Sequence, residues 1–216
     1  MQAFTNVTAI PIPLVRDNID TDIIIPARYL KTVSRKGLGE GAFYTLRHRD
    51  DGIPDPASPF NQARFKDSAI LVAGDNFGCG SSREHAAWAL VDLGIRVVIA
   101  ESFADIFDSN AFKNGILTVT LPRPAISRIA AEGEAGRAVE VSLEECRVRL
   151  ADGTTYGFEI DPFRRRCLLE GLDEVALTLA EHGEAIAAFE AEQRERAPWL
   201  WETPTNALTL TKSAPR

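Results

Sequence analysis

Short apolar runs alternate with helical segments through the middle of the chain, and this alternation restricts the possible folds more than any other feature. Apolar runs at Ile70–Ala73, Ile95–Ala100 and Leu117–Leu121 predict buried strands. The intervening segments, Ser82–Leu93 and Phe103–Lys113, have the pattern of helices. Strands joined through helices require right-handed crossovers and a mainly parallel sheet. We therefore expect an α/β fold with a mixed, largely parallel sheet flanked by helices.

The two ends of the chain add further elements. Val7–Val15 predicts one strand, and Ala138–Ile160 predicts a hairpin that turns at Asp152-Gly153. A long C-terminal helix is expected, followed by an extended arm. Its predicted apolar face consists of Leu172, Val175, Leu179, His182, Ile186 and Phe189. We expect residues 1–171 to form the main domain, and residues 172–216 to add the helix and arm to the same unit.

Composition excludes several classes of function. The 216 residues carry a formal charge of −7, which argues against a general nucleic-acid surface or a basic membrane patch. No apolar run approaches the ~20 residues that span a bilayer, and the first residues lack the features of a secretory signal. The three cysteines, Cys79, Cys146 and Cys167, are too far apart for a disulfide framework or an autonomous metal site. We expect a cytoplasmic protein with no metal of its own.

The segment Gly74–His85, "GDNFGCGSSREH", joins a predicted strand to a predicted helix. Its glycines expose backbone N–H groups at a helix start, where the helix dipole favours an anion. Arg83 adds a guanidinium that can bind a carboxylate through two hydrogen bonds. The segment therefore predicts an anion site. A serine in such a positive pocket could lose its proton without a histidine partner.

Other interpretations of this segment are open. Ser81 and Glu84 have the spacing of a capping box, which would need no ligand. Gly78 and Gly80, with Glu101 after the next strand, resemble part of a dinucleotide-binding pattern, although Arg83 occupies the place of its third small residue. No G-x-S-x-G motif is present, so hydrolase chemistry has little support.

Single reactive side chains near this segment are interpreted as structural. Cys79 stands between two glycines with no second thiol nearby, so we expect it to line the loop. His85 lies four residues beyond Ser81 and is expected to pack or pair within the fold.

Three motifs resemble the swivelling domain of the aconitase superfamily. "GCGSSREHAAWAL" is similar to its "G-x-G-S-S-R-E-H-A" signature. "DNIDTDIIIPARYL" and "ESFADIFDSNAFKNGIL" resemble two further segments, and all three occur in the family's order between Asn18 and Leu117. The resemblance implies a swivelling β/β/α domain, of the kind found as separate small subunits.

The resemblance also implies an enzyme divided between two chains. A large subunit would carry a [4Fe–4S] cluster, and this chain would supply Ser81 as the base that removes a carbon-bound proton. Ser82, Arg83, Gly80, Asp20 and Thr21 would bind the dicarboxylate substrate. The glycine-rich segment Lys31–Gly41 would select the substrate's side chain, and its implied specificity residues are Lys31, Arg35, Lys36 and Leu38.

Within the superfamily, the length and the basic loop are most similar to small subunits of a hydro-lyase of leucine biosynthesis. That enzyme interconverts 2-isopropylmalate and 3-isopropylmalate through 2-isopropylmaleate. The small subunits of homoaconitase and of citraconate or methylmalate hydro-lyases are alternatives, as is a non-catalytic regulatory subunit. Pro13 occupies the position of an aconitase arginine that binds substrate, and Arg16 is not in register with it. The partner of the second carboxylate is therefore open.

Overall fold

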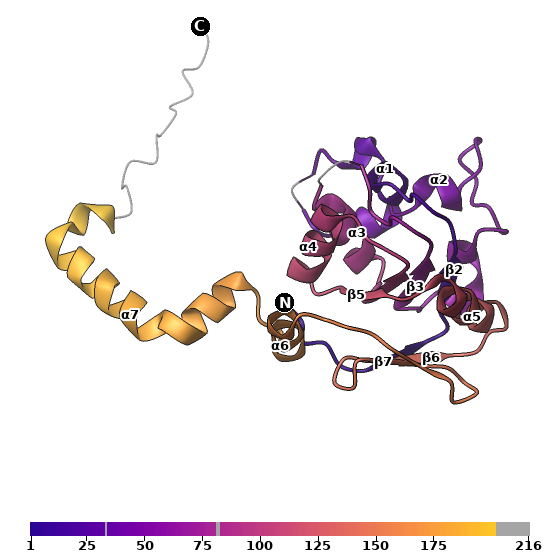
Figure 1. The fold of residues 1–216 in the computed structure, drawn as a ribbon. Coiled ribbons are helices and arrows are strands. Elements are labelled where there is room, and N and C mark those ends of the chain that lie inside the picture. The colour runs from indigo at the N-terminus through magenta and orange to yellow at the C-terminus, as the bar shows by residue number, and fades with distance from the viewer. Residues whose placement is uncertain (33, 81–82, 202–216) are drawn as a thin grey trace, which may run out of the picture. The chain divides into compact units, whose positions relative to one another are not determined.

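The computed structural model describes residues 1–32, 34–80 and 83–201. The described chain forms two compact units, Met1–Asp173 and a unit that begins at Glu174. Figure 1 shows the first unit as a layered body of strands and helices. Ser81 and Ser82 lie outside the described residues.

The predicted parallel sheet is confirmed. It consists of β2 (Ile12–Leu14), β3 (Ile70–Ala73), β4 (Val97–Ala100) and β5 (Leu117–Thr120), hydrogen-bonded in that order with all neighbours parallel. Every residue of β3 and β4 is buried, as expected for strands covered on both faces. Helices α3 (His85–Asp92) and α4 (Asp105–Lys113) connect these strands. Gly94 and Gly115, both with positive φ, follow the ends of these helices, where such a conformation favours glycine.

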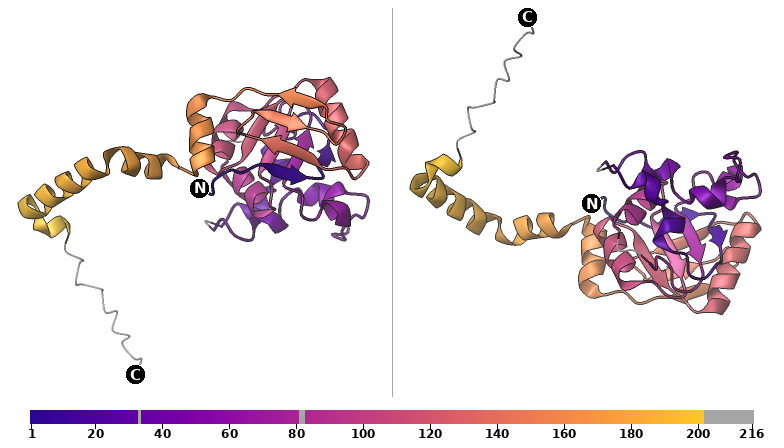
Figure 2. Two further views of the ribbon diagram at one scale, coloured as in Figure 1. Left: turned by 90° about the horizontal axis from the view of Figure 1, so that it is seen from below. Right: turned by 90° about the horizontal axis from the view of Figure 1, so that it is seen from above.

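The remaining strands form a second, antiparallel sheet rather than extending the first. It consists of β1 (Val7–Ala9), β6 (Val139–Ser142), β7 (Arg147–Arg149) and β8 (Thr155–Gly157), paired in that order. Figure 2 shows it as a separate layer over the parallel sheet. Alternate residues of the two sheets share one core with α5 (Arg123–Glu134) and α6 (Pro162–Glu170). The other face of the parallel sheet packs against α3 and α4. The α/β class and the β/β/α layering agree with the expectation.

Two strand predictions were wrong in detail. The single strand predicted over Val7–Val15 is divided into β1 and β2, which belong to different sheets. Pro11 lies between them and has no N–H to continue a ladder. The predicted hairpin has three strands. Its turn at Asp152-Gly153 is confirmed, but a second turn at Cys146, with φ of 50°, was not predicted.

Short helices occupy the segment between β2 and β3. Two are α-helices, α1 (Thr21–Ile24) and α2 (Tyr44–Arg47). The others are the 3-10 helices η1 (Ala27–Tyr29), η2 (Leu38–Glu40), η3 (Pro59–Asn61) and η4 (Ala63–Phe65).

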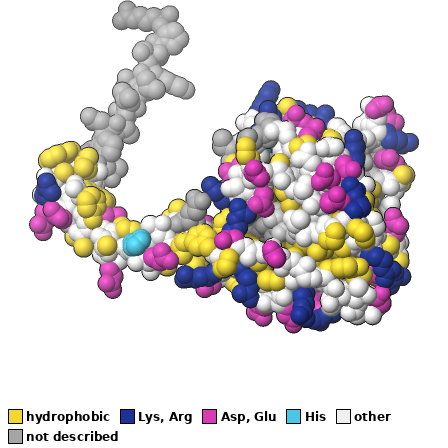
Figure 3. All heavy atoms as spheres, viewed as in Figure 1, with side chains coloured by type: hydrophobic (Ala, Val, Ile, Leu, Met, Phe, Trp, Pro, Cys, Tyr) yellow, Lys and Arg dark blue, Asp and Glu magenta, His cyan; other side chains and the backbone are white. Residues whose placement is uncertain are grey.

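The second unit contains α7 (Glu174–Arg196) and the 3-10 helix η5 (Pro198–Leu200). The predicted helix is present, but its apolar face is largely exposed, with 62% of Phe189 accessible to solvent. Figure 3 shows hydrophobic side chains on the surface of this unit. His182 on this face is also exposed. None of the helices in the described ranges is long and apolar enough to cross a membrane.

Gly133 provides a test of the packing between α5 and the segment that enters β2. A Cβ at Gly133 would clash with the carbonyl oxygen of Pro11. We expect Gly133→Ala to lower the free energy of unfolding by about 1–3 kcal/mol, because the clash exceeds the gain in helix propensity. Gly183→Ala in α7 is the control, since its Cβ would meet no neighbour within 4 Å. Urea denaturation showing equal effects of the two changes would contradict this packing.

Candidate functional site

The three sequence motifs follow successive strands of the parallel sheet. Asp17–Asp22 comes after β2, Gly74–His85 after β3, and the segment that begins at Glu101 after β4. Because the carboxyl ends of parallel strands meet at one edge of a sheet, the fold brings these motifs together. This edge is the position at which open α/β sheets bind their ligands.

Backbone hydrogen bonds join the motifs directly. The amide of Gly78 donates to the Ile19 carbonyl at 2.7 Å, and the amide of Thr21 donates to the Cys79 carbonyl at 2.9 Å. On the other side, the amide of Phe77 donates to the Ser102 carbonyl at 3.0 Å. The glycine-rich segment is therefore held between the other two motifs.

The glycines allow this close approach. A Cβ at Gly74 would clash with the side chain of Asp17, and a Cβ at Gly78 would clash with the ring of Phe107. Gly80 differs because it is exposed and its Cβ would lie 3.5 Å from Asp20, an ordinary contact. Its φ of 91° nevertheless favours glycine. Packing thus explains two of the glycines, and backbone conformation explains Gly80.

A cavity of about 220 Å³ opens beside this segment. Three of the predicted substrate-binding residues, Thr21, Gly80 and Arg83, line it together with residues of α4. Asn110 of α4 also lines it, and sequence reasoning missed this residue although it lies within the third motif. Ser81 and Ser82 are between Gly80 and Arg83 in the chain but outside the described residues. The cavity therefore lies beside the segment predicted to bind an anion.

Arg83 is the cationic side chain at this cavity. Its Nη1 lies 3.7 Å from the Asp22 carboxylate, too far for a hydrogen bond, and its side chain is 39% exposed. Nη1 itself is buried and has no hydrogen-bond acceptor among the residues that the structure describes. An oxyanion at this position would supply the missing acceptor.

The side chain of Asp20 has a hydrogen-bond partner within the protein. It caps α1 by accepting a hydrogen bond from the amide of Ile23 at 2.7 Å. Thr21, the first residue of α1, is buried and borders the cavity. Asp20 therefore orients the start of α1 beside the glycine turn.

The carboxylate of Glu84 has partners other than Ser81, the capping-box candidate that lies outside the described residues. It accepts hydrogen bonds from Trp88 Nε1 at 3.1 Å and Asn114 Nδ2 at 2.9 Å, and α3 begins only at His85. Partial burial raises the pKa of Glu84, but the hydrogen bonds from Asn114 and Trp88 and the charge of Arg35 outweigh it, so the pKa is lowered. Through these hydrogen bonds, Glu84 joins the start of α3 to the end of α4.

His85 and Cys79 occupy structural positions, as expected. His85 Nε2 lies 3.0 Å from the Thr32 carbonyl oxygen, to which it must donate its proton, and its ring lies 4.7 Å from that of Trp88. Burial, and next the charge of Asp20, raise the pKa of the Cys79 thiol. A thiol with a raised pKa is a poor nucleophile and a poor metal ligand at neutral pH.

The segment Lys31–Gly41 differs from the expected substrate loop. Leu38 is only 2% exposed and belongs to the main core, so it does not face a ligand. Its neighbour Gly39 packs against the end of α3, where its amide donates to Asp92 Oδ2 at 2.7 Å. Arg35 lies over the ring of Trp88, and Lys31 and Lys36 are exposed. The predicted specificity role of Leu38 is therefore corrected. Leu38 is part of η2, and its side chain is buried in the hydrophobic core.

A second, partly apolar cavity of about 610 Å³ adjoins the first. Ala27 and Leu30 line it on one side, and Arg83, Glu84, His85 and Trp88 line it on the other. Arg83 borders both cavities. The arrangement can accommodate a carboxylate at Arg83 with an apolar group directed toward Leu30.

An ion-pair cluster that sequence reasoning missed stabilises the same edge of the sheet. Arg123 Nη2 lies 2.6 Å from Asp17 Oδ1, and Arg123 Nε lies 2.6 Å from Glu101 Oε2. Asp17 also accepts a hydrogen bond from the Asp75 amide, which, with Arg123, lowers the pKa of Asp17. Glu101 thus has an ion-pair partner within the protein, where the dinucleotide interpretation would use it for a ribose hydroxyl. This argues against the dinucleotide interpretation.

Asp17→Asn tests this cluster through its pH dependence. Because the folded state lowers the pKa of Asp17, its stabilisation is present above the ordinary aspartate pKa of about 3.9 and is lost as the pH falls through the folded value. We expect the variant to melt roughly a few degrees below the wild type at pH 7. The difference should shrink below about pH 4. A difference that is constant from pH 7 to pH 3 in thermal melts would exclude this role.

Three family models match the chain. The first, "Aconitase C-terminal domain", matches residues 1–124, and the second, "LeuD_N", matches residues 128–162. The third describes the C-terminal domain of the 3-isopropylmalate dehydratase small subunit and matches residues 174–201. The first model covers the three motifs described above, and the third covers α7 and η5.

Curated proteins and a solved structure extend these matches over most of the chain. The 3-isopropylmalate dehydratase small subunit of Rhodospirillum centenum is 53% identical over 92% of this chain and 98% of its own length. That of Novosphingobium aromaticivorans is 56% identical over 88% and 90%. A crystal structure of 3-isopropylmalate dehydratase from Methanocaldococcus jannaschii superimposes with a TM-score of 0.63, at 29% identity, over 86% of this chain and 99% of that one.

Proposed function

The chain belongs to the family of 3-isopropylmalate dehydratase small subunits, and we propose that its Ser81 and Arg83 act directly on the substrate. It is the small subunit of a hydro-lyase of leucine biosynthesis, which acts as part of a complex with a large subunit. The observation that carries the proposal is the buried Nη1 of Arg83, which has no acceptor in the described chain and adjoins the glycine turn.

The reaction requires removal of a proton from a carbon next to a carboxylate. Ser81 takes this proton as an alkoxide, which forms only where nearby positive charge and backbone amides lower the pKa of the hydroxyl. Arg83 and the amides around Gly80 and Ser82 supply that environment and bind the substrate carboxylate. Loss of the neighbouring hydroxyl as water gives 2-isopropylmaleate, and rehydration in the opposite sense gives the isomer.

The resemblance to aconitase implies a [4Fe–4S] cluster, and we assign it to the large subunit. Within the described ranges, no three His, Cys, Asp or Glu side chains are grouped as metal ligands. When bound, iron would act as a Lewis acid toward the departing hydroxyl. We propose that the protein acts in the cytoplasm, where thiols such as those of its three cysteines stay reduced.

The cavity lined by Ala27, Leu30 and Trp88 is the proposed site for the substrate's isopropyl group. It replaces the contact expected from Leu38, which is buried in the core. Leu30 comes just before the segment Lys31–Gly41. The proposed contact with the isopropyl group therefore stays next to the predicted segment but moves from Leu38 to Leu30. Lys31 stays a candidate at the start of this segment, while Arg35 and Lys36 line a different cavity.

Two groups of alternatives have weaker support. The relatives that match most of the chain bear the name of the isopropylmalate enzyme, which argues against homoaconitase and methylmalate hydro-lyases. A purely regulatory subunit would have no need for an arginine with an unused buried donor beside a glycine turn.

Substitution of Ser81 and Arg83 tests the catalytic proposal in the enzyme reconstituted with its large subunit. We expect Ser81→Ala to lower kcat by about 10²–10⁴-fold, because the base is lost, with little change in melting temperature. Arg83→Gln should lower kcat/KM, because the carboxylate loses a charged donor. Ser127→Ala, an exposed serine of α5, is the control and should change neither. Full activity of Ser81→Ala with a lowered melting temperature would leave only a capping role.

A pair of leucine substitutions tests the isopropyl site. Leu30→Ala should reduce the preference for isopropylmalate over methylmalate, measured as a ratio of kcat/KM values, by about tenfold, because apolar contact is lost. Leu38→Ala should lower the free energy of unfolding by about 2–5 kcal/mol, because it leaves a cavity in the core, and should leave that ratio unchanged. The opposite pattern would return the specificity role to Leu38.

A further inference from the structure

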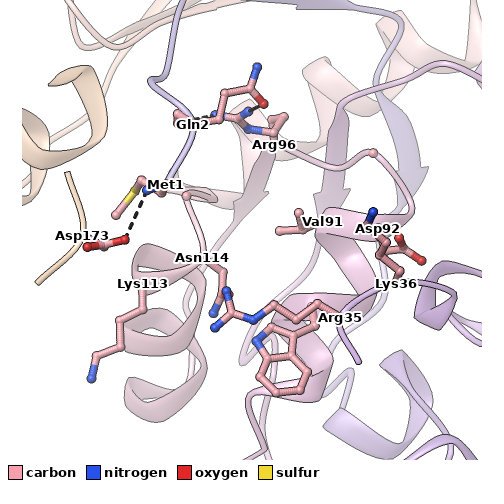
Figure 4. Close-up of a pocket in the computed structure, with 13 residues that line it drawn as sticks. Met1, Gln2, Arg35, Lys36, Val91, Asp92, Arg96, Lys113, Asn114 and Asp173 are labelled. Atoms are coloured by element: carbon pink, nitrogen blue, oxygen red, sulfur yellow. Dashed lines mark hydrogen bonds and ion pairs between the residues drawn. The ribbon is translucent and has the colours of Figure 1, made fainter. Parts of the chain in front are cut away.

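A third cavity, of about 670 Å³, lies at the edge of the parallel sheet opposite to the motifs. Arg96 and Gly115 line it just before β4 and β5 begin, and Asp92 and Lys113 line it where α3 and α4 end. Figure 4 shows its labelled side chains gathering from these segments and from residues 35–36. None of its lining residues borders the cavity of about 220 Å³ beside the glycine turn.

The lining of this cavity is cationic, although the chain as a whole has a formal charge of −7. In the described chain, its basic side chains are Arg35, Lys36, Arg96 and Lys113. Two carboxylates also line it, and both have partners. Asp92 accepts from the Gly39 amide, and the Asp173 carboxylate lies 3.4 Å from the amino group of Met1. The cavity therefore has an excess of positive charge.

Arg96 lines this cavity, and one of its donors has no acceptor among the described residues. Its guanidinium donates to the side chain and carbonyl of Gln2 at 2.7 and 3.3 Å, as Figure 4 shows. Its Nε is buried without an acceptor among the described residues. Burial also lowers the pKa of Arg96, so its surroundings disfavour the positive charge. A bound anion would offset this cost.

Arg35 and Lys36 can also reach an anion. Arg35 Nη2 lies 3.8 Å from Glu84, too far for a hydrogen bond, and its guanidinium carbon lies 5.1 Å from the centroid of Trp88. Lys36 is exposed at the rim. Trp88 and Val91 add apolar surface to the same lining. The cavity volume is within the range of small-molecule sites.

We propose that this cavity is a second ligand site, which binds a small organic oxyanion, either a phosphate or a carboxylate, that carries an apolar group. Arg35, Lys36 and Arg96 bind the charged group, and the apolar part lies against Trp88 and Val91. Arg35 also faces Glu84, the residue after Arg83, so one residue of the site contacts the catalytic segment.

Isothermal titration calorimetry on the full chain tests the site. The probes are phenyl phosphate and phenylacetate, with inorganic phosphate as the charged group alone. We expect saturable binding of at least one aromatic probe, tighter than that of inorganic phosphate because the apolar surface contributes. Arg35→Gln combined with Lys36→Gln should weaken binding by about tenfold or more, because two of the cations that bind the charged group are lost.

Two control variants separate this site from other anion binding. Lys66→Gln combined with Arg147→Gln removes the same charge from exposed positions elsewhere and should leave the dissociation constant unchanged. Arg83→Gln, which alters the catalytic cavity, should also leave it unchanged. The proposal is overturned if neither aromatic probe binds saturably, if the Arg35/Lys36 variant binds as tightly as the wild type, or if Arg83→Gln abolishes binding. A preference for phenyl phosphate or for phenylacetate identifies the charged group and supports the site.

Discussion

Backbone pairing between the Ile19–Thr21 segment and the Gly78–Cys79 turn is the constraint on which the rest of the site depends. Close packing around this pairing leaves no room for a side chain at Gly74, which faces Asp17, or at Gly78, which faces Phe107. Once the two segments are paired, Thr21, Gly80 and Arg83 border one cavity. Parallel strand order makes this possible, because β2, β3 and β4 all end at the same edge.

Local charge, and not the net charge of the protein, determines where anions can bind. Arg83 lies just before α3, and the described carboxylate that it faces, Asp22, is at ion-pair distance only. At the opposite edge, Arg96 is partly desolvated in a lining with more cations than carboxylates. Desolvation strengthens the attraction of such groups for an anion, whereas an exposed charge elsewhere on this acidic chain is screened by water and salt.

Glu84 links the segment that contains Arg83 to residues that line the cationic cavity. Its carboxylate binds Trp88 and Asn114 and lies within ion-pair distance of Arg35, and it directly follows Arg83. Trp88 lines both the proposed isopropyl cavity and the cationic cavity. The start of α3 is thereby anchored to α4 and to the segment Lys31–Gly41 by side chains that the capping-box interpretation did not use.

The sequence by itself determined the parallel sheet, the order of its strands along the chain, and the family to which the motifs belong. These follow from local periodicity and from residues close together in the chain. Only the tertiary structure decided that Val7–Val15 divides between two sheets, that Leu38 is buried while Leu30 borders a cavity, and that Asp17, Glu101 and Arg123 form one cluster. An apolar pattern shows that a side chain will be covered, but it does not show what covers it. Similarly, Asp17 and Arg123 form an ion pair although more than eighty residues of chain separate them, and no local spacing in the sequence can indicate such a contact.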